Sequence, residues 1–283
     1  MEDLTEEKND LELEETEGKV RARKKKKGGG GKIWLVMILV CVCVLGFSGY
    51  QLMSILLEYK AGTDEYDDLQ QYVISEVPEI ADTEEGDTEE QEEGEEEPAL
   101  QHVSFDELKA INENIIAWIE IPDTQISYPV MQGSDNAYYL NHTFRDKVNG
   151  AGSIFMETLN ASDFTDYHTI LYGHNMKNGS MFGSLSEYKS PTYLVAHPYI
   201  YVSVEEGMLQ YEIFSCYVTK VGSESYTIGF APDEVYAEYL EMIKGNSLYD
   251  TGVEVSVENQ ILTLSTCEKS GKTSRFVVHA KRI

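Results

Sequence analysis

Residues 33–57 form an apolar stretch that only Gly, Ser, Gln and Tyr interrupt. The stretch is long enough to cross a bilayer as a helix, for which about 20 residues suffice. A basic run at 21–27 precedes it, and an acidic segment follows it. Because positive charge stays on the cytoplasmic side, this asymmetry predicts a cytoplasmic N-terminus and an extracytoplasmic remainder. A cleaved signal peptide is the alternative, but its apolar core is shorter and ends at a small-residue cleavage site.

The predicted span divides the chain into four regions. Residues 1–32 form a cytoplasmic tail, 33–57 a single-pass signal anchor in the cell membrane, 58–100 an acidic extracytoplasmic linker, and 101–283 a folded domain. The net charge of −28 lies largely outside that domain, and 82–97 alone carry eleven acids in sixteen positions. Like charges at this density repel, which predicts an extended spacer. The folded region is only moderately acidic, which argues against nucleic acid as a partner.

Cysteine usage agrees with an exported domain that needs no disulfide. Cys41 and Cys43 lie inside the predicted span, so only Cys216 and Cys267 remain in the exported part. Export permits a disulfide. However, the sequence around Cys216 is typical of a strand interior, where a cysteine is usually a small buried apolar residue.

The exported region is predicted to be mostly β, because it alternates many short strands with turns and has few helices. A capping box at Ser104–Glu107 begins one helix. Another has Pro232 in its first turn, Gly245 after its last, and one apolar face; a weaker short helix is expected over 64–75. The residues of that apolar face are Val235, Tyr236, Tyr239, Leu240 and Ile243. The candidate strands are 117–121, 153–156, 169–172, 200–204, 210–220, 253–257, 261–266 and 275–282. This pattern predicts a closed or nearly closed barrel.

Three residues at predicted strand ends carry the candidate chemistry. Cys267 closes the segment Thr-Leu-Ser-Thr-Cys, His174 ends the run Ile-Leu-Tyr-Gly-His, and Arg275 begins the strand after Cys267. A thiol nucleophile needs a proton partner and a group that holds developing negative charge. An imidazole and a guanidinium supply these. If the strands that end at Cys267 and start at Arg275 form an antiparallel hairpin, both residues lie at its mouth.

Each of the three also has a structural explanation when it is taken alone. Cys267 fits a packed strand residue, His174 a capping residue and Arg275 a surface charge. Their occurrence together in ordered motifs favours catalysis.

The motifs resemble those of the sortases, the membrane-anchored cysteine transpeptidases of Gram-positive bacteria, and class B most of all. The resemblance is carried by 135–140 (Asp-Asn-Ala-Tyr-Tyr-Leu), 152–155 (Gly-Ser-Ile-Phe), 171–176 (Leu-Tyr-Gly-His-Asn-Met), 179–182 (Gly-Ser-Met-Phe) and the segment that ends at Cys267. It extends over about 101–283. It implies an eight-stranded β-barrel with an N-terminal helix and a helix before the last strands.

The resemblance also implies a reaction and a site. Such an enzyme cuts a C-terminal sorting signal after Thr, holds the protein as a Cys thioester, and passes it to an amine. The catalytic residues would be His174, Cys267 and Arg275, and no cofactor or metal is implied. The expected substrate-binding residues are Asn136, Leu140, Tyr172, Tyr226, Ser265 and Thr266, of which Thr266 would offer its backbone N–H to the oxyanion.

Several alternatives stay open on the sequence. The partners would be surface proteins with an Asn-Pro-x-Thr-Asn-like or Ser/Asn-Pro-x-Thr-Gly-like signal, and the acceptor a peptidoglycan precursor or a pilin amine. A membrane-anchored cysteine protease that only hydrolyses, or an inactive surface scaffold, are the rival functions. Leu140 and Tyr172 are equally compatible with core packing, and the role of Glu268 is open.

Overall fold

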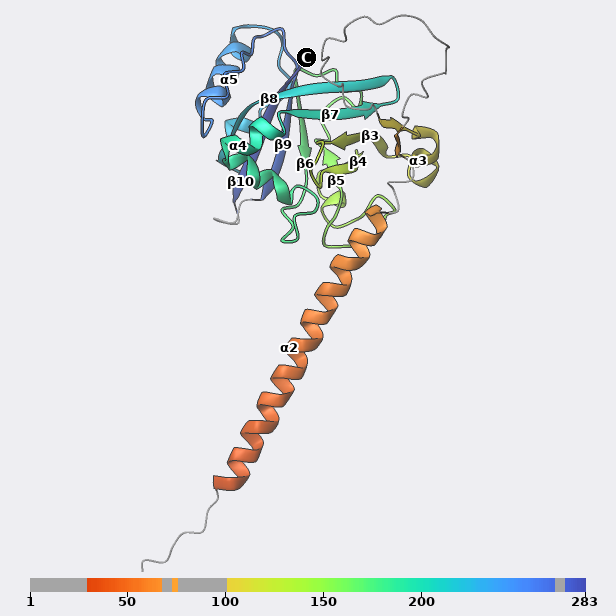
Figure 1. Cartoon of the computed structure of the whole chain (residues 1–283), viewed down its shortest axis with the longest axis vertical. Helices are drawn as coiled ribbons and strands as arrows, with labels where there is room; N and C mark the ends of the chain where they lie inside the picture. Colours follow the sequence, from red (N-terminus) through yellow and green to blue (C-terminus); the bar gives the residue numbers. More distant parts are fainter. Residues whose placement is uncertain (1–29, 68–72, 76–100, 268–272) are drawn as a thin grey trace, which may run out of the picture. The chain divides into compact units, whose positions relative to one another are not determined.

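Residues 30–67, 73–75, 101–267 and 273–283 are described in a computed structural model of the chain (Figure 1). The chain divides into two compact units, Met1–Ser54 and Ile55–Ile283. The predicted acidic spacer 82–97 and Glu268 lie outside the described residues.

Helix α2 (Gly30–Asp67) contains the predicted membrane segment. Within it, Trp34–Ser54 has a mean hydropathy of 2.2 and is long and apolar enough to cross a membrane. The helix expected over 64–75 is wrong, because α2 ends at Asp67 and Val73–Ser75 form strand β1. β1 pairs antiparallel with β2 (Gln101–Val103), where β-branched residues favour the extended conformation.

The last turn of α2 packs on the folded domain. Tyr66 is buried and donates a hydrogen bond to the carbonyl oxygen of Gly152, at 2.7 Å. Its neighbour Glu65 lies 3.3 Å from the Lys147 ammonium and 3.7 Å from Nε of Arg145. Part of the segment assigned to the linker therefore contributes to the compact unit that begins at Ile55.

Eight strands close into a barrel in the order β10-β8-β7-β3-β4-β5-β6-β9, which confirms the predicted fold. Two pairs are parallel, β4 with β5 and β6 with β9, and the other six are antiparallel. The strands are β3 (Ile115–Glu120), β4 (Ser127–Met131), β5 (Ile154–Met156), β6 (His168–Tyr172), β7 (Tyr199–Val204), β8 (Gly207–Lys220), β9 (Ile261–Cys267) and β10 (Ser274–Arg282).

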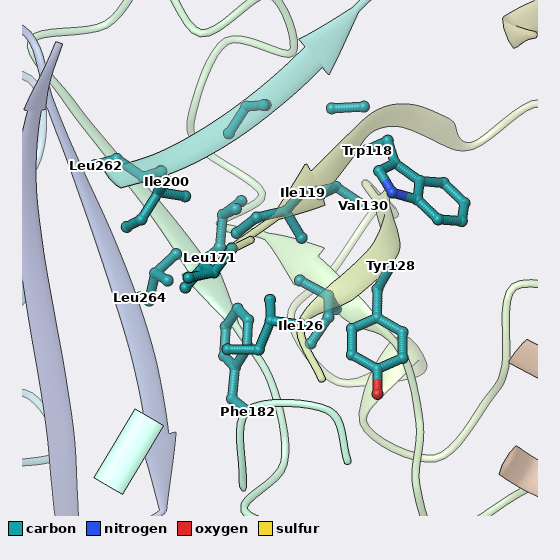
Figure 2. Close-up of a cluster of buried hydrophobic side chains, with 14 of the residues drawn as sticks. Trp118, Ile119, Ile126, Tyr128, Val130, Leu171, Phe182, Ile200, Leu262 and Leu264 are labelled. Atoms are coloured by element: carbon teal, nitrogen blue, oxygen red, sulfur yellow. The ribbon is translucent and has the colours of Figure 1, made fainter. Parts of the chain in front are cut away.

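Apolar side chains from both halves of the sequence fill the barrel. Figure 2 shows Ile119, Leu171, Ile200 and Leu264 converging from four strands, and each is fully buried. Because these strands come from distant parts of the chain, the interior forms only when the barrel closes. This packing fixes the strand ends that carry the candidate site.

Two strand predictions fail for identifiable reasons. β4 was not among the expected strands, and it forms although Pro129 in its middle is unfavourable in a strand interior. Conversely, 253–257 alternate valine with polar residues but form no strand. The three valines are half-buried against a hydrophobic cluster under helix α5 (Glu234–Gly245). Alternating burial of these side chains therefore gives a strand-like sequence pattern without any pairing to a neighbouring strand.

Helix α5 packs against side chains of β8, β9 and β10 through Tyr236, Tyr239, Leu240 and Ile243. Val235 was assigned to the same face, but it is 63% exposed. Pro232 was expected in the first turn of α5, but it lies before the helix. Asp233 is the N-cap residue, and its carboxylate accepts from the backbone N–H of Tyr236.

Helix α3 (Phe105–Ile111) begins after Ser104 as expected, but the Ser104 side chain makes no capping hydrogen bond. The remaining helical segments are short. They are α4 (Pro191–Ala196) and the 3-10 turns η2 (Tyr138–Leu140), η3 (Gly183–Lys189) and η4 (Glu224–Tyr226).

Candidate active site

Cys267 and Arg275 are direct cross-strand partners at the open end of the β9–β10 hairpin. Six further pairs follow along the ladder, and the strands are buried from Ile261 to Thr266 and from Phe276 to Ala280. Cys267 itself is exposed and Arg275 is half-buried. The rigid sheet thus brings the thiol and the guanidinium to the same end, as the hairpin prediction required.

His174 follows β6, which runs parallel to β9 and places Tyr172 beside Ser265. The backbone N–H of Gly173 donates to the carbonyl oxygen of Ser265, at 3.1 Å. Nε2 of His174 donates to the carbonyl oxygen of Leu140, at 2.6 Å, since a carbonyl only accepts. In the neutral ring Nδ1 is then the basic nitrogen.

Glycine is required next to His174 in the chain and beside the Leu140 carbonyl that accepts from it. A Cβ at Gly173 would lie 2.6 Å from the ring of Phe182. Gly152, with a φ of +58°, would place a Cβ 2.7 Å from the Leu140 oxygen that accepts from His174. Both contacts are shorter than normal packing allows, so small residues here hold the histidine and its acceptor in place.

Asn175, next to the histidine, was not predicted to belong to the site. Its side-chain amide donates to the backbone carbonyl oxygen of Cys267, at 2.7 Å. The resemblance motif contained Asn175, but nothing in the sequence indicated that its partner lies 92 positions away.

One cavity of about 350 Å³ contains all nine predicted site positions. It is lined by Asn136, Leu140, Phe155, Tyr172, Gly173, His174, Val221, Gly222, Tyr226, Ser265, Thr266, Cys267 and Arg275. Phe155, Gly173, Val221 and Gly222 are the members that the sequence did not single out. Leu140 and Tyr172 line a cavity in addition to any packing role.

Aromatic rings form one wall of this cavity. Tyr172 and Tyr226 stack with their ring centroids 6.3 Å apart, and Tyr226 shares a 2.8 Å hydrogen bond with the hydroxyl of Ser265. Burial raises the pKa of both phenols, so both stay protonated near neutral pH. The hydroxyl of Thr266 donates to the carbonyl oxygen of Gly173, at 2.8 Å.

A carboxylate that the sequence did not indicate fixes two groove residues. Glu157 accepts from the side-chain amide of Asn136 at 2.6 Å and from the hydroxyl of Tyr172 at 2.8 Å. Glu157 is half-buried and follows directly after β5. The sequence signal was only that an acid follows the buried Gly-Ser-Ile-Phe motif.

Two histidines outside the cavity are completely buried behind it. His168 contacts the hydroxyl of Thr263, which in turn contacts His279, both at 2.7 Å. The other ring nitrogen of His168 donates to the carbonyl oxygen of Thr227, at 2.6 Å. Burial lowers the pKa of His168 to about 4 and that of His279 well below its usual range, so both rings are neutral and structural.

Among the described residues, no group of three or more His, Cys, Asp or Glu side chains is arranged to hold a metal ion. The chemistry that this site supports is that of a thiol, an imidazole and a guanidinium. These suit covalent acyl transfer to a cysteine.

A family model described as the sortase domain matches residues 119–283. Sortase B of Listeria monocytogenes is 40% identical over 181 residues, covering 62% of this chain and 73% of that protein. Sortase B of Staphylococcus aureus is 36% identical over 181 residues, covering 63% and 74%.

Solved structures agree with these relatives. A sortase B from B. anthracis in complex with AAEK1 has a TM-score of 0.66 at 34% identity, covering 81% of this chain and 99% of that one. A Staphylococcus aureus sortase B–substrate complex has a TM-score of 0.60 at 36% identity, covering 63% and 84%. The chain therefore belongs to the sortase family of transpeptidases, in its class B.

Proposed function

We propose that this sortase uses Cys267 as its nucleophile, His174 as its general acid and base, and Arg275 as the group that holds substrate charge. The observation that carries the proposal is the pairing of Cys267 with Arg275 at the mouth of one hairpin, within a cavity that His174 also lines. Three unrelated structural roles would not require these side chains to share a cavity.

The reaction follows from these three groups. The thiolate of Cys267 attacks the carbonyl carbon of the signal threonine, and the peptide C–N bond breaks as His174 protonates the leaving amine. This leaves a thioester. An incoming amine then gives a proton to His174 and attacks the thioester carbonyl, which forms a new amide and releases the thiolate.

Arg275 serves both halves of this reaction. A guanidinium presents several fixed N–H donors, which suit a carbonyl oxygen that becomes an oxyanion. The backbone N–H of Thr266, next to the nucleophile, is the second proposed donor to that oxyanion. The groove residues proposed for the sorting signal are Asn136, Leu140, Tyr172, Tyr226 and Ser265.

The same proposal covers location and partners. Residues 33–57 would anchor the enzyme with its N-terminus in the cytoplasm, and the catalytic domain would face the cell wall. Surface proteins with a C-terminal sorting signal are the proposed substrates, and an amine of a peptidoglycan precursor or a pilin is the proposed acceptor.

The test uses the full chain in detergent micelles with two quenched fluorescent peptides, containing Asn-Pro-Ala-Thr-Asn and Ser-Pro-Ala-Thr-Gly. Each peptide is incubated with and without added triglycine, and the products are identified by mass. We expect cleavage after Thr, a triglycine-linked product, and complete loss of both in Cys267→Ala. Cys216→Ala is the matched control, because this second thiol is buried and donates to the carbonyl oxygen of Tyr188.

The rival functions give different outcomes. A protease that only hydrolyses would release product at a rate that triglycine does not change. An inactive scaffold would bind the peptides without cleaving them. Turnover that survives in Cys267→Ala would refute the assignment of the nucleophile.

A further inference from the structure

We propose that Glu157 is a positioning residue that sets the hydrogen-bond polarity of the substrate groove, by holding the Asn136 amide in one orientation and turning the Tyr172 hydroxyl into an acceptor. The inference rests on the proposed function, since the groove must be the one that receives the peptide. Glu157 does not line the cavity and acts through residues that do.

The backbone of Glu157 is held on two sides. Its N–H donates to the carbonyl oxygen of Ile170 at 2.9 Å, and its own carbonyl oxygen accepts from Asn160 at 2.9 Å. The amide of Gln132 donates to the same carbonyl oxygen at 3.3 Å. The carboxylate therefore extends from a fixed point on the barrel toward the groove.

The side-chain amide of Asn136 is hydrogen-bonded through both its nitrogen and its oxygen. Its Nδ2 donates to Oε1 of Glu157 at 2.6 Å, and its Oδ1 accepts from the backbone N–H of Thr158 at 2.9 Å. A flipped amide would place its oxygen against the carboxylate, which is repulsive. Only one orientation is compatible with Glu157, and in it one N–H of Nδ2 is left for a peptide carbonyl.

Tyr172 has a single hydroxyl hydrogen, and Oε2 of Glu157 accepts it at 2.8 Å. What the phenol oxygen then offers to the cavity is a lone pair. The ring is fixed as well, because it stacks on Tyr226 and contacts Phe155 with centroids 5.3 Å apart. The phenol oxygen therefore has a fixed position in the cavity wall, where it can accept a hydrogen bond from a peptide N–H.

The two effects together define what the groove selects. Without the carboxylate, Tyr172 would donate or accept, and the backbone N–H of Thr158 alone would orient the Asn136 amide. With it, the groove presents an acceptor at Tyr172 and a donor at Asn136, which matches an extended peptide backbone that offers an N–H and a C=O. The Tyr226–Ser265 hydroxyl pair differs from Tyr172, because either of its two oxygens can be the donor and its polarity is not fixed.

The experiment compares Glu157→Gln, Tyr172→Phe and the double variant in the full chain in detergent micelles. Glutamine keeps the size of the side chain but has N–H groups that donate to the phenol, so the Tyr172 hydrogen is released to the groove. The matched control is Glu254→Gln, an exposed acid paired with Lys244. The probe is the Asn-Pro-Ala-Thr-Asn peptide, together with a set in which one backbone amide at a time is N-methylated.

We expect Glu157→Gln to raise KM about tenfold while kcat changes less than about threefold, because ground-state binding is lost and the reacting groups are untouched. The double variant should lose less than the product of the two single effects, because Tyr172 carries part of the role of Glu157. One N-methylated peptide should be impaired with the wild type and show no further loss with either single variant.

Three results would overturn the inference. The first is Glu157→Gln with wild-type kinetics, and the second is multiplicative effects in the double variant. The third is a fall in kcat and melting temperature with KM unchanged, which indicates a structural role. If Glu157→Gln does not fold, the N-methyl series on the wild type and Tyr172→Phe still decides whether Tyr172 accepts from the peptide.

Peptide binding to Cys267→Ala, measured by fluorescence anisotropy, separates this inference from the proposed function. Peptide binding that needs Glu157, with no cleavage by the wild type, would refute transpeptidation by Cys267 and keep the role of Glu157. Cleavage that does not change in the Glu157 variant would support transpeptidation by Cys267 and refute the role of Glu157.

Discussion

Asn175 donates a hydrogen bond from its side-chain amide to the backbone carbonyl of Cys267, with 2.7 Å between the nitrogen and the oxygen. Asn175 directly follows His174, so the turn that carries the imidazole also holds the peptide group of the nucleophile. This single contact couples two strand ends, of β6 and β9, at the point where the proposed thiol and its proton partner must cooperate.

Asn175→Ala should lower kcat/KM about tenfold to a hundredfold, because it frees the peptide group of Cys267 to shift relative to His174. Asn175→Asp should be at least as harmful, since a carboxylate cannot donate to a carbonyl. Steady-state cleavage of a fluorescent sorting-signal peptide measures the effect. Asn178→Ala is the control, because Asn178 accepts from Ser180 within its own turn. Equal activity in the Asn175 and Asn178 variants would rule out the coupling.

Arg275→Lys should lower kcat/KM about a hundredfold, because the ammonium keeps the charge but loses the planar fork of donors. Arg282→Lys, at the far end of the same strand, where Arg282 donates to the side chain of Gln260, should be nearly neutral. Pre-steady-state acylation would show the defect in the first chemical step. Near wild-type turnover by Arg275→Lys would contradict the proposed oxyanion role.

Gly152→Ala should destabilise the protein by about 1–3 kcal/mol and also reduce activity. Its φ is +58°, and an added Cβ would lie 2.5 Å from the carbonyl oxygen of Tyr139 and 2.7 Å from that of Leu140. Gly252→Ala isolates the backbone strain, because Gly252 has a φ of +74° but open space around it. Urea unfolding and peptide cleavage are measured on both. A Gly152→Ala protein that loses stability but keeps full turnover would show that the Leu140 carbonyl does not position His174 for the reaction.

Stability should fall in acid because of the buried His168 and His279. The folded pKa of His168 is about 4 against 6.5 in the unfolded chain, since burial outweighs the nearby Asp166 and the Thr227 carbonyl. The unfolded state therefore binds more protons between these values, and stability is full above about pH 6.5 and is lost as the pH falls toward 4. For His168 the loss is about 3 kcal/mol, and His279 adds to it in the same direction.

Urea unfolding at pH 7.5 and pH 5 measures this dependence. His168→Gln should be less stable at pH 7.5 but lose less on acidification than the wild type. The half-buried His142, stacked on Tyr138, provides the control, and His142→Gln should keep the wild-type difference between the two pH values. An unchanged difference in His168→Gln would mean that other groups control the acid transition.

Sequence patterns identified the elements that depend on local properties. The apolar run predicted the helix that contains Trp34–Ser54, and alternating short segments predicted seven of the eight barrel strands. The hairpin that pairs Cys267 with Arg275 was also predictable, because it joins two neighbouring strands. Eight of the nine site positions came from ordered motifs, and Tyr226 came from a segment expected beside the groove. All nine line one cavity, although their roles stay predictions.

The tertiary structure decided the relationships that cross large distances along the chain. Asn175 meets the carbonyl of Cys267, and Glu157 holds Asn136, only because parallel β6–β9 pairing and barrel closure bring these segments together. β4 pairs despite Pro129, since burial between β3 and β5 outweighs local propensity. Local patterns report the preference of each segment for a helix, a strand or a membrane. The orientation of a side chain in a site depends instead on partners that only the closed barrel supplies.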